Sequence, residues 1–389
     1  MWRNITSNFL TAMIVILVLV AGMVAWAKRE YTVSGPLTQA MCLRVDQGDS
    51  FVKVSADLKS KGAISSGYIF RTGADYTEKG GKLKFGSYLI EPGATMEQIV
   101  DQITRGGPST CGSELVYRVG VNAQTLALRE LDPATGMYEE LAKYDPVADP
   151  EPDGFKELVE EKNITNHRVI LAEGATSWHI VQALKSYDFL SGDVKDIPAE
   201  GSLAPQSYVV SKGETRETLI GQMQDAQTAI LNEAWANRAE GLPYKTPEEA
   251  LTMASIVEKE TGVASERPEV ASVFVNRLEK GMRLQTDPTV IYGVTDGKGS
   301  LGRGLRQSEL RANNPYNTYV IEGLPPTPIA NPGRAAIEAA LNPDSTDYLY
   351  FVADGSGGHA FATTLEEHNA NVAKWREIEA QQAKDAGGN

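Results

Sequence analysis

An uncharged stretch of 19 residues near the N-terminus, from Phe9 to Ala27, constrains this chain more than any other feature. Val, Leu, Ile, Ala and Met dominate the stretch. As a helix it would extend about 28 Å, at roughly 1.5 Å per residue, which is close to the hydrocarbon thickness of a bilayer. It therefore predicts a transmembrane helix at 9–27, preceded by a short cytoplasmic stub at 1–8.

A cleaved secretory signal peptide is the alternative interpretation of the same residues, because Ala25-Trp26-Ala27 has the small-x-small form of a cleavage site. The apolar run is longer than a typical signal core and carries a Trp at its outer end, which favours an uncleaved anchor. Both interpretations export the rest of the chain. We expect a single-pass protein of the cell inner (cytoplasmic) membrane, with its globular part in the periplasm or outside.

Charge and composition exclude several classes of function. The 389 residues suffice for two or three domains. The net charge of -14 makes nucleic acid an unsuitable partner, because phosphate binding needs a basic surface. The four histidines show no metal-ligand spacing, and no glycine-rich phosphate-binding loop is present, so we expect neither a metal nor a cofactor.

Cys42 and Cys111 are the only cysteines of the chain. In an oxidising compartment they can form a disulfide, and the alternative is two unpaired, partly buried thiols. The choice depends on the distance between their Cα atoms, so the sequence leaves it open.

One local pattern occurs four times in the first half of the exported chain. An apolar strand is followed by Gly, one further residue, Ser or Thr, and an apolar-periodic helix; glycine permits the turn and the hydroxyl caps the helix. These β-α units resemble LysM glycan-binding modules. The alternative is an ordinary strand-turn-helix connection, which is common enough to explain any single copy. The glycine and hydroxyl residues are Gly48 and Ser50, Gly93 and Thr95, Gly174 and Thr176, and Gly213 and Thr215.

We predict an α+β protein with a LysM-like region at 39–200, a second domain at 201–380 and a flexible tail at 381–389. The Pro- and acid-rich residues 132–153 predict an exposed loop, within an insertion at about 112–165. In the second domain, helices surround a small antiparallel sheet. A capping box at Thr246 opens a helix that ends near Thr261, another helix covers 268–280, and strands are expected at 348–353 and 359–362.

The helix that starts at Thr246 carries two carboxyl groups within a broad apolar arc, those of Glu258 and Glu260. A carboxyl group buried there is either paired with a base or has a raised pKa that suits it to donate a proton. Periodicity alone does not choose between the two residues.

The sequence around this helix closely resembles the signature of the endolytic murein transglycosylase family (YceG-like). The order and spacing of the motifs match the family's catalytic domain over about residues 200–380. The matching segments are ASIVEKET at 254–261, ASER at 264–267, VFVNRL at 273–278, GMRLQTDPTVIYG at 281–293, YNTY at 316–319, GLPP at 323–326, and YLYFVA at 348–353 followed by His359.

The resemblance implies that Glu258 is the catalytic acid and base. It would protonate the glycosidic oxygen between N-acetylmuramic acid and N-acetylglucosamine. It would then accept the proton of the muramic acid 6-hydroxyl, which closes to a 1,6-anhydro ring. Other polar and aromatic positions in the motifs suit sugar binding, and a structural role is the alternative for each; they are Gln285, Asp287, Tyr292, Tyr316, Asn317, Tyr319 and His359. Glu260 is a candidate for tuning the pKa of Glu258 by its like charge.

The sequence leaves three functions open. The first is a lytic transglycosylase that cuts nascent peptidoglycan strands and ends their elongation. The second is a non-enzymatic wall-binding scaffold for cell-wall synthesis or division. The third is a glycoside hydrolase, which needs a second carboxylate such as Asp287. The expected partners are peptidoglycan glycan strands, the membrane and, as further candidates, cell-wall synthases.

Overall fold

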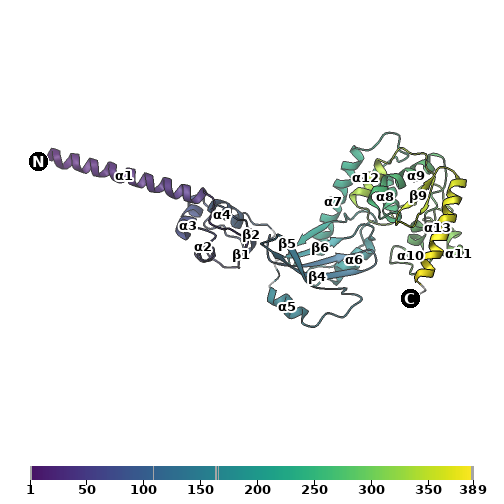
Figure 1. The fold of residues 1–389 in the computed structure, drawn as a ribbon, viewed down its shortest axis with the longest axis horizontal. Helices are drawn as coiled ribbons and strands as arrows, with labels where there is room; N and C mark the ends of the chain where they lie inside the picture. The colour runs from purple at the N-terminus through teal and green to yellow at the C-terminus, as the bar shows by residue number, and fades with distance from the viewer. Residues whose placement is uncertain (1, 108, 163, 165, 387–389) are drawn as a thin grey trace. The chain divides into compact units, whose positions relative to one another are not determined.

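The computed structural model describes residues 2–107, 109–162, 164 and 166–386, and mixes helices with strands as an α+β fold (Figure 1). The predicted fold class is therefore confirmed at this level. The chain divides into two compact units. The N-terminal unit comprises 1–115, 127–143 and 151–167, and the C-terminal unit comprises 116–126, 144–150 and 168–389.

The N-terminal unit begins with the long helix α1 (Trp2–Thr32). Its apolar side chains between Phe9 and Trp26 are largely exposed, and among the described residues Phe9–Thr32 is the one helix long and apolar enough to cross a membrane. The helix is thus compatible with the expected anchor. It is longer than the predicted span at both ends, because the flanking polar residues continue the same helix.

A small α/β module follows α1 in the N-terminal unit. Strands β1 and β2 pair antiparallel, with Leu43 opposite Tyr88, and two helices lie between them in the chain. Apolar residues from every element, among them Phe70 and Ile99, form one core. The elements are β1 (Met41–Val45), α2 (Phe51–Ser60), α3 (Gly67–Tyr76), β2 (Gly86–Ile90) and α4 (Met96–Arg105).

The two cysteines form a disulfide, which resolves the alternative that the sequence left open. Cys42 lies on β1 and Cys111 lies 69 residues later, with their Cα atoms 5.6 Å apart. The backbone N–H groups of Thr110 and Cys111 donate to the carbonyl of Ser87 on β2, which brings the second cysteine beside the first strand pair.

A five-stranded sheet has the strand order β5-β4-β3-β6-β7. Residues 132–153, expected to be an exposed loop, contain the edge strand β5; that expectation was wrong for this segment. As an edge strand β5 has one paired side, and none of its side chains is fully buried; its apolar and charged residues do not alternate, so the sequence pattern does not reveal it. The strands are β3 (Ser113–Val119), β4 (Gln124–Asp132), β5 (Met137–Tyr144), β6 (Asn166–Leu171) and β7 (Ser207–Val210), and helix α5 (Phe155–Lys162) precedes β6.

All four predicted strand-glycine-hydroxyl-helix turns are present. The four glycines have positive φ angles between 71° and 90°, which glycine adopts without steric cost. Each hydroxyl residue is the N-cap of the helix that follows and accepts a backbone N–H. The caps are Ser50 for α2, Thr95 for α4, Thr176 for α6 (Ser177–Ser186) and Thr215 for α7 (Arg216–Ala236).

Helix α8 (Pro247–Glu260) lies at the centre of the helical part of the C-terminal unit (Figure 1). It contacts α7, α9 and, most extensively, α12, and its residues 250–257 are all buried. The remaining elements are the 3-10 turn η1 (Ala264–Glu266), α9 (Arg267–Glu279), α10 (Asp287–Thr295), α11 (Gln307–Leu310), α12 (Arg334–Leu341), β8 (Tyr350–Ala353), β9 (His359–Ala362) and α13 (Leu365–Ala386).

The end of the chain differs from the expected flexible tail. Helix α13 packs on the β8-β9 hairpin and continues through Ala386, so residues 381–386 are helical. Residues 387–389 lie outside the described part.

Candidate active site

Glu258 lies in the last turn of α8, the helix that the sequence predicted from its capping box. Thr246 is the N-cap and accepts the N–H of Glu249, and Pro247 occupies the first helical position. Because the helix is apolar on almost every side, its end carries Glu258 into the interior, and only 6% of the side chain is exposed. Sequence and packing thus place one carboxyl group where water has little access.

Within the described part of the chain, two groups contact the Glu258 carboxyl. The backbone N–H of Gly333 donates to Oε2 at 2.9 Å, and the guanidinium Nη2 of Arg267 lies 3.8 Å from Oε1. Burial raises the pKa of Glu258, and the negative charge of Glu173 raises it further. The Gly333 N–H and the charges of Arg267 and Lys259 oppose these effects, but the net pKa remains above its ordinary value, as expected from the apolar helix face.

Glu173 is a second carboxylate at this site, and sequence reasoning missed it. It follows β6, directly before Gly174 in the third strand-glycine turn. The same Nη2 of Arg267 lies 3.5 Å from Glu173 Oε2, so one guanidinium nitrogen is shared by the carboxylates of Glu173 and Glu258. The available signal was a charged residue beside a turn glycine, which is too common to indicate a site.

Of the two glycines beside these carboxyl groups, Gly333 is the one where a side chain would collide with a carboxylate. A Cβ atom on Gly333 would lie 1.9 Å from Glu173 Oε1, whereas a Cβ on Gly174 would lie 3.6 Å from Glu258 Cγ. The φ angle of Gly333 is -72°, which any residue adopts, so the constraint there is space and not backbone conformation.

Arg267 is buried, with 9% of the residue exposed, and begins α9. Its Nε has no hydrogen-bond partner among the described residues. The guanidinium therefore balances two carboxylates and keeps one donor unused, next to the proposed acid.

Lys259 extends from α8 toward a second buried carboxyl group, that of Glu200. Its Nζ donates to the Gly174 carbonyl at 3.3 Å. Burial lowers the pKa of Lys259, and the negative charges of Glu258 and Glu200 oppose this lowering. Glu200 accepts the Ser177 N–H at 2.8 Å and the Tyr292 hydroxyl at 3.2 Å. Burial raises the pKa of Glu200, and these hydrogen bonds oppose the rise.

Two of the predicted sugar-binding residues, Tyr292 and Tyr316, lie on this Glu200 side with ring centroids 4.9 Å apart. Both line a cavity of about 1050 Å³ that Glu200 also lines. A smaller cavity of about 360 Å³ is lined by Tyr292, Lys259 and Gly174. The structure therefore connects these tyrosines to the surroundings of Glu258 through Lys259.

Three other predicted residues surround Glu260 and not Glu258. Asp287 and Tyr319 interact electrostatically with Glu260, and Tyr319 donates to Asp287 Oδ1 at 2.7 Å. Gln285, with a positive φ of 52°, directly precedes Thr286, which donates its hydroxyl proton to Glu260. Burial raises the pKa of Glu260; the Thr286 hydrogen bond opposes this, while the charge of Asp287 adds to it. The larger influences on the pKa of Glu258 come from burial, Gly333, Glu173, Arg267 and Lys259.

Asn317 is buried, and its amide donates to the carbonyls of Glu309, Leu310 and Ala312. These bonds hold the loop after α11, which is the structural alternative that the sequence allowed.

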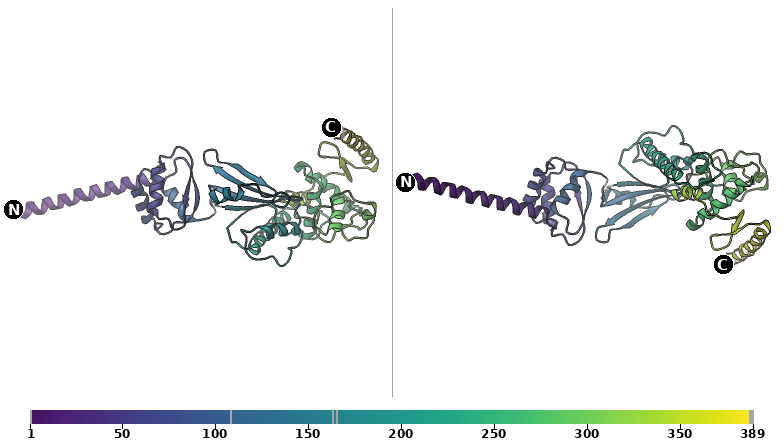
Figure 2. Two further views of the ribbon diagram at one scale, coloured as in Figure 1. Left: turned by 90° about the horizontal axis from the view of Figure 1, so that it is seen from below. Right: turned by 90° about the horizontal axis from the view of Figure 1, so that it is seen from above.

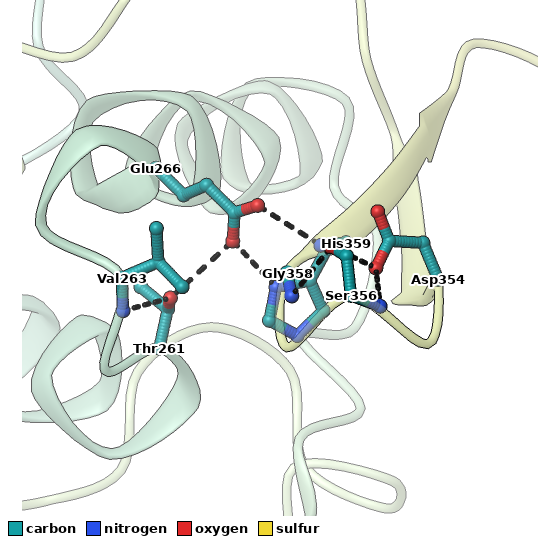
Figure 3. Close-up of polar contacts among 7 residues, drawn as sticks. All are labelled: Thr261, Val263, Glu266, Asp354, Ser356, Gly358 and His359. Carbon is teal, nitrogen blue, oxygen red and sulfur yellow. Dashed lines mark hydrogen bonds and ion pairs between the residues drawn. The ribbon is translucent and has the colours of Figure 1, made fainter.

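His359 is held by Glu266 (Figure 3). The Glu266 carboxylate accepts the backbone N–H of His359 at 2.9 Å and lies 2.8 Å from its Nδ1, and Thr261 also contacts it. Glu266 thereby attaches the β8-β9 hairpin to the connection between α8 and α9. Arg267 is the next residue in the chain, so this attachment also fixes the start of the helix that carries the shared guanidinium.

Among the described residues, no group of three or more His, Cys, Asp or Glu side chains is arranged to hold a metal ion.

Comparisons with known proteins agree with the motif resemblance. A model of the YceG-like family matches residues 43–374. The chain is 30% identical to the endolytic murein transglycosylase of Bacillus subtilis, over 86% of this chain and 84% of that protein. It is 28% identical to the Streptococcus pneumoniae protein of the same name, over 85% of this chain and 57% of that longer protein.

A solved yceG-like protein from Listeria monocytogenes shares 26% identity, covering 85% of this chain and 98% of that chain, with a TM-score of 0.45. The family match covers both units and includes Glu258, Glu173 and Arg267. The chain therefore belongs to the YceG-like family.

Proposed function

We propose that this protein is an endolytic murein transglycosylase with Glu258 as its acid and base. The observation that carries the proposal is the position of Glu258, a nearly buried carboxyl group with a raised pKa inside the family motif. The names of the Bacillus and Streptococcus relatives support the same activity, with peptidoglycan glycan strands as substrate.

The proposed reaction uses Glu258 in both directions. Because Oε2 accepts the Gly333 N–H, Oε1 is the oxygen that carries the proton to the glycosidic oxygen between N-acetylmuramic acid and N-acetylglucosamine. The carboxylate that results is stabilised by the Gly333 N–H and by Arg267. It then accepts the proton of the muramic acid 6-hydroxyl, whose oxygen bonds to the anomeric carbon and forms a 1,6-anhydro end.

Glu173 is our candidate for the tuning role that the sequence suggested for Glu260. Its charge raises the pKa of Glu258, and it shares Arg267 with that residue. As a negative group beside the reacting carbon, it would also favour the positive charge that develops on the sugar ring during bond cleavage.

The sugar-binding assignments remain predictions. The cavity walls favour Tyr292 and Tyr316 as surfaces for stacking sugar rings. Asp287 and Tyr319 interact electrostatically with Glu260, and Gln285 is two residues before Asp287 in the chain; the role of these three would be to shape a more distant part of the binding surface. His359 is a candidate for sugar contact through the ring that Glu266 orients.

We further propose that α1 anchors the protein in the inner membrane, with both units in the periplasm or outside. The β1-α2-α3-β2 order, with antiparallel β1 and β2, supports a LysM-like module inside the region 39–200, and the YceG-like catalytic domain would cover 201–380. We also propose that the enzyme ends the elongation of glycan strands and that cell-wall synthases are its partners.

A glycoside hydrolase is the second candidate, because Glu173 supplies the second carboxylate that hydrolysis needs. Digestion of purified peptidoglycan followed by mass spectrometry distinguishes the reactions. We expect 1,6-anhydromuropeptides, each lighter by one water than the hydrolytic product. Reducing ends would indicate the hydrolase, and the absence of cleavage would indicate the wall-binding scaffold.

A further inference from the structure

The outer face of α3 is exposed and carries no charged side chain. Tyr68, Thr72 and Tyr76 are spaced four residues apart and so share one face of the helix. The two tyrosines are 72% and 90% exposed. The charged residues of α3 are directed elsewhere: Arg71 donates to the Ser55 hydroxyl at 2.7 Å, and the Asp75 carboxylate lies against Gly80.

Helix α3 is packed directly on the end of α1. Gly73 lies under the Tyr31 ring, so close that a Cβ atom there would be 2.3 Å from a ring carbon, and Tyr31 is 7% exposed. Ser65, just before α3, donates its hydroxyl proton to the Glu30 carboxylate. In both views of Figure 2, α1 extends away from the module of α2, α3, α4 and the β1-β2 pair, and meets it only at its C-terminal end. The position of α3 along α1 is therefore defined by close contacts.

A cavity of about 430 Å³ lies between the two helices. Val24, Ala27 and Lys28 of α1 line one side, and Tyr68, Thr72 and Tyr76 of α3 line the other. Val24 and Ala27 belong to the uncharged run of the proposed anchor. The tyrosines of α3 therefore lie at the level of the last turn of that run, where a bilayer passes from acyl chains to headgroups.

We propose that this α3 face and the cavity beside it lie in the headgroup region of the bilayer and hold a phospholipid. This inference rests on the proposed membrane anchor. Tyrosine suits that depth because its ring is apolar and its hydroxyl is polar. Lys28 would contact the lipid phosphate, and Glu97 of α4, which also lines the cavity, would contact the ammonium group of a zwitterionic headgroup.

The continuity of the surface with the anchor favours lipid over a protein partner. One wall of the cavity is the span itself, so any occupant is at the membrane surface. The consequence is that the first module is held flat against the bilayer by two helices instead of being suspended from one.

The test uses the full chain, one copy per nanodisc, in a mixture of phosphatidylethanolamine and phosphatidylcholine. Single cysteines are introduced as Tyr76→Cys, Val52→Cys and Ala21→Cys and labelled with an NBD fluorophore; the native cysteines are paired and do not react. Lipids spin-labelled near the headgroup serve as quenchers. Val52 is the matched control, because it lies in the same unit on α2 and is 62% exposed.

We expect quenching at position 76 to be several-fold greater than at position 52, with a blue-shifted emission. Equal quenching at 76 and 52, while position 21 is quenched, would overturn the proposal. A blue shift at 76 without quenching would also overturn it, because protein and not lipid would then cover the face. Absence of quenching at 21 would refute the anchor itself, which is a different failure.

Discussion

Glu258 and Glu260 lie two residues apart on one helix, are both buried, and both have a raised pKa, yet they have different partners. A step of two residues turns the helix by about 200°, so the two carboxyl groups point to opposite sides of α8. Glu258 accepts the Gly333 N–H and faces the charges of Arg267, Lys259 and Glu173. Glu260 accepts the Thr286 hydroxyl and faces the charges of Asp287, His359 and Arg277. Burial raises the pKa of both carboxyl groups, so the comparison depends on their partners. Glu258 shares the Arg267 guanidinium with Glu173, whereas Glu260 accepts a hydrogen bond from a hydroxyl group.

The largest difference in activity should appear between variants that lack the carboxyl group of Glu258 and variants that lack that of Glu260. Glu258→Gln keeps the shape but cannot transfer a proton, so we expect loss of cleavage by about 10²–10⁴-fold. The measurement is muropeptide release from purified peptidoglycan, with circular dichroism as the control for folding. Glu260→Gln should retain most of the activity. Equal losses in the two variants would contradict the distinction between the two sides of α8.

Gly333→Ala should lower activity by roughly 10-fold, the effect of about 1.4 kcal/mol in the transition state. The backbone at Gly333 accepts alanine, so the added Cβ acts by displacing the Glu173 carboxylate. The same substitution in a Glu173→Ala background should cost little more, because the displaced group is already absent. A loss that is equally large in both backgrounds would show that Gly333 acts without Glu173.

Glu260 should matter for stability more than for catalysis. Glu260→Ala leaves the Thr286 hydroxyl without its acceptor, and we expect a loss of about 1–3 kcal/mol in the free energy of unfolding. Because burial raises the pKa of Glu260 in the folded protein, the wild type binds this proton more tightly when folded. It therefore loses stability as the pH rises from the ordinary carboxyl pKa through the raised one. Glu260→Gln should weaken this dependence. Urea unfolding at several pH values measures the free energy of unfolding of the wild type and of both variants. If stability depends on pH in the same way in Glu260→Gln as in the wild type, the prediction is wrong.

The smallest expected effect is a shift of the pH profile. Activity requires protonated Glu258, so it should fall as the pH rises through the raised pKa of that residue. Glu173→Gln removes a like charge and should move this fall to lower pH by a fraction of a unit, whereas Glu260→Gln should leave it in place. The profile of kcat/KM against pH, measured for the wild type and for both variants, shows which of the two residues influences the pKa of Glu258. A shift in the Glu260 variant alone would restore the tuning role that the sequence suggested for it.

Local sequence determined the parts of this protein that depend on neighbours along the chain. The four glycine-hydroxyl turns, the cap of α8 and the apolar run of α1 were all predictable, because each depends on backbone geometry or hydrogen bonds within a few residues. The motif resemblance also identified the family and predicted Glu258 as the catalytic acid and base.

Tertiary structure decided what depends on residues distant in the chain. Glu173, Arg267 and Gly333 reach Glu258 from three separate segments, and no periodicity connects them. The disulfide likewise depends on a Cα distance that strand pairing creates. The edge strand β5 could not be predicted because its apolar and charged residues do not alternate along the strand. Electrostatic interactions act through space, so the residues that set the pKa of Glu258 are defined only once the chain has folded.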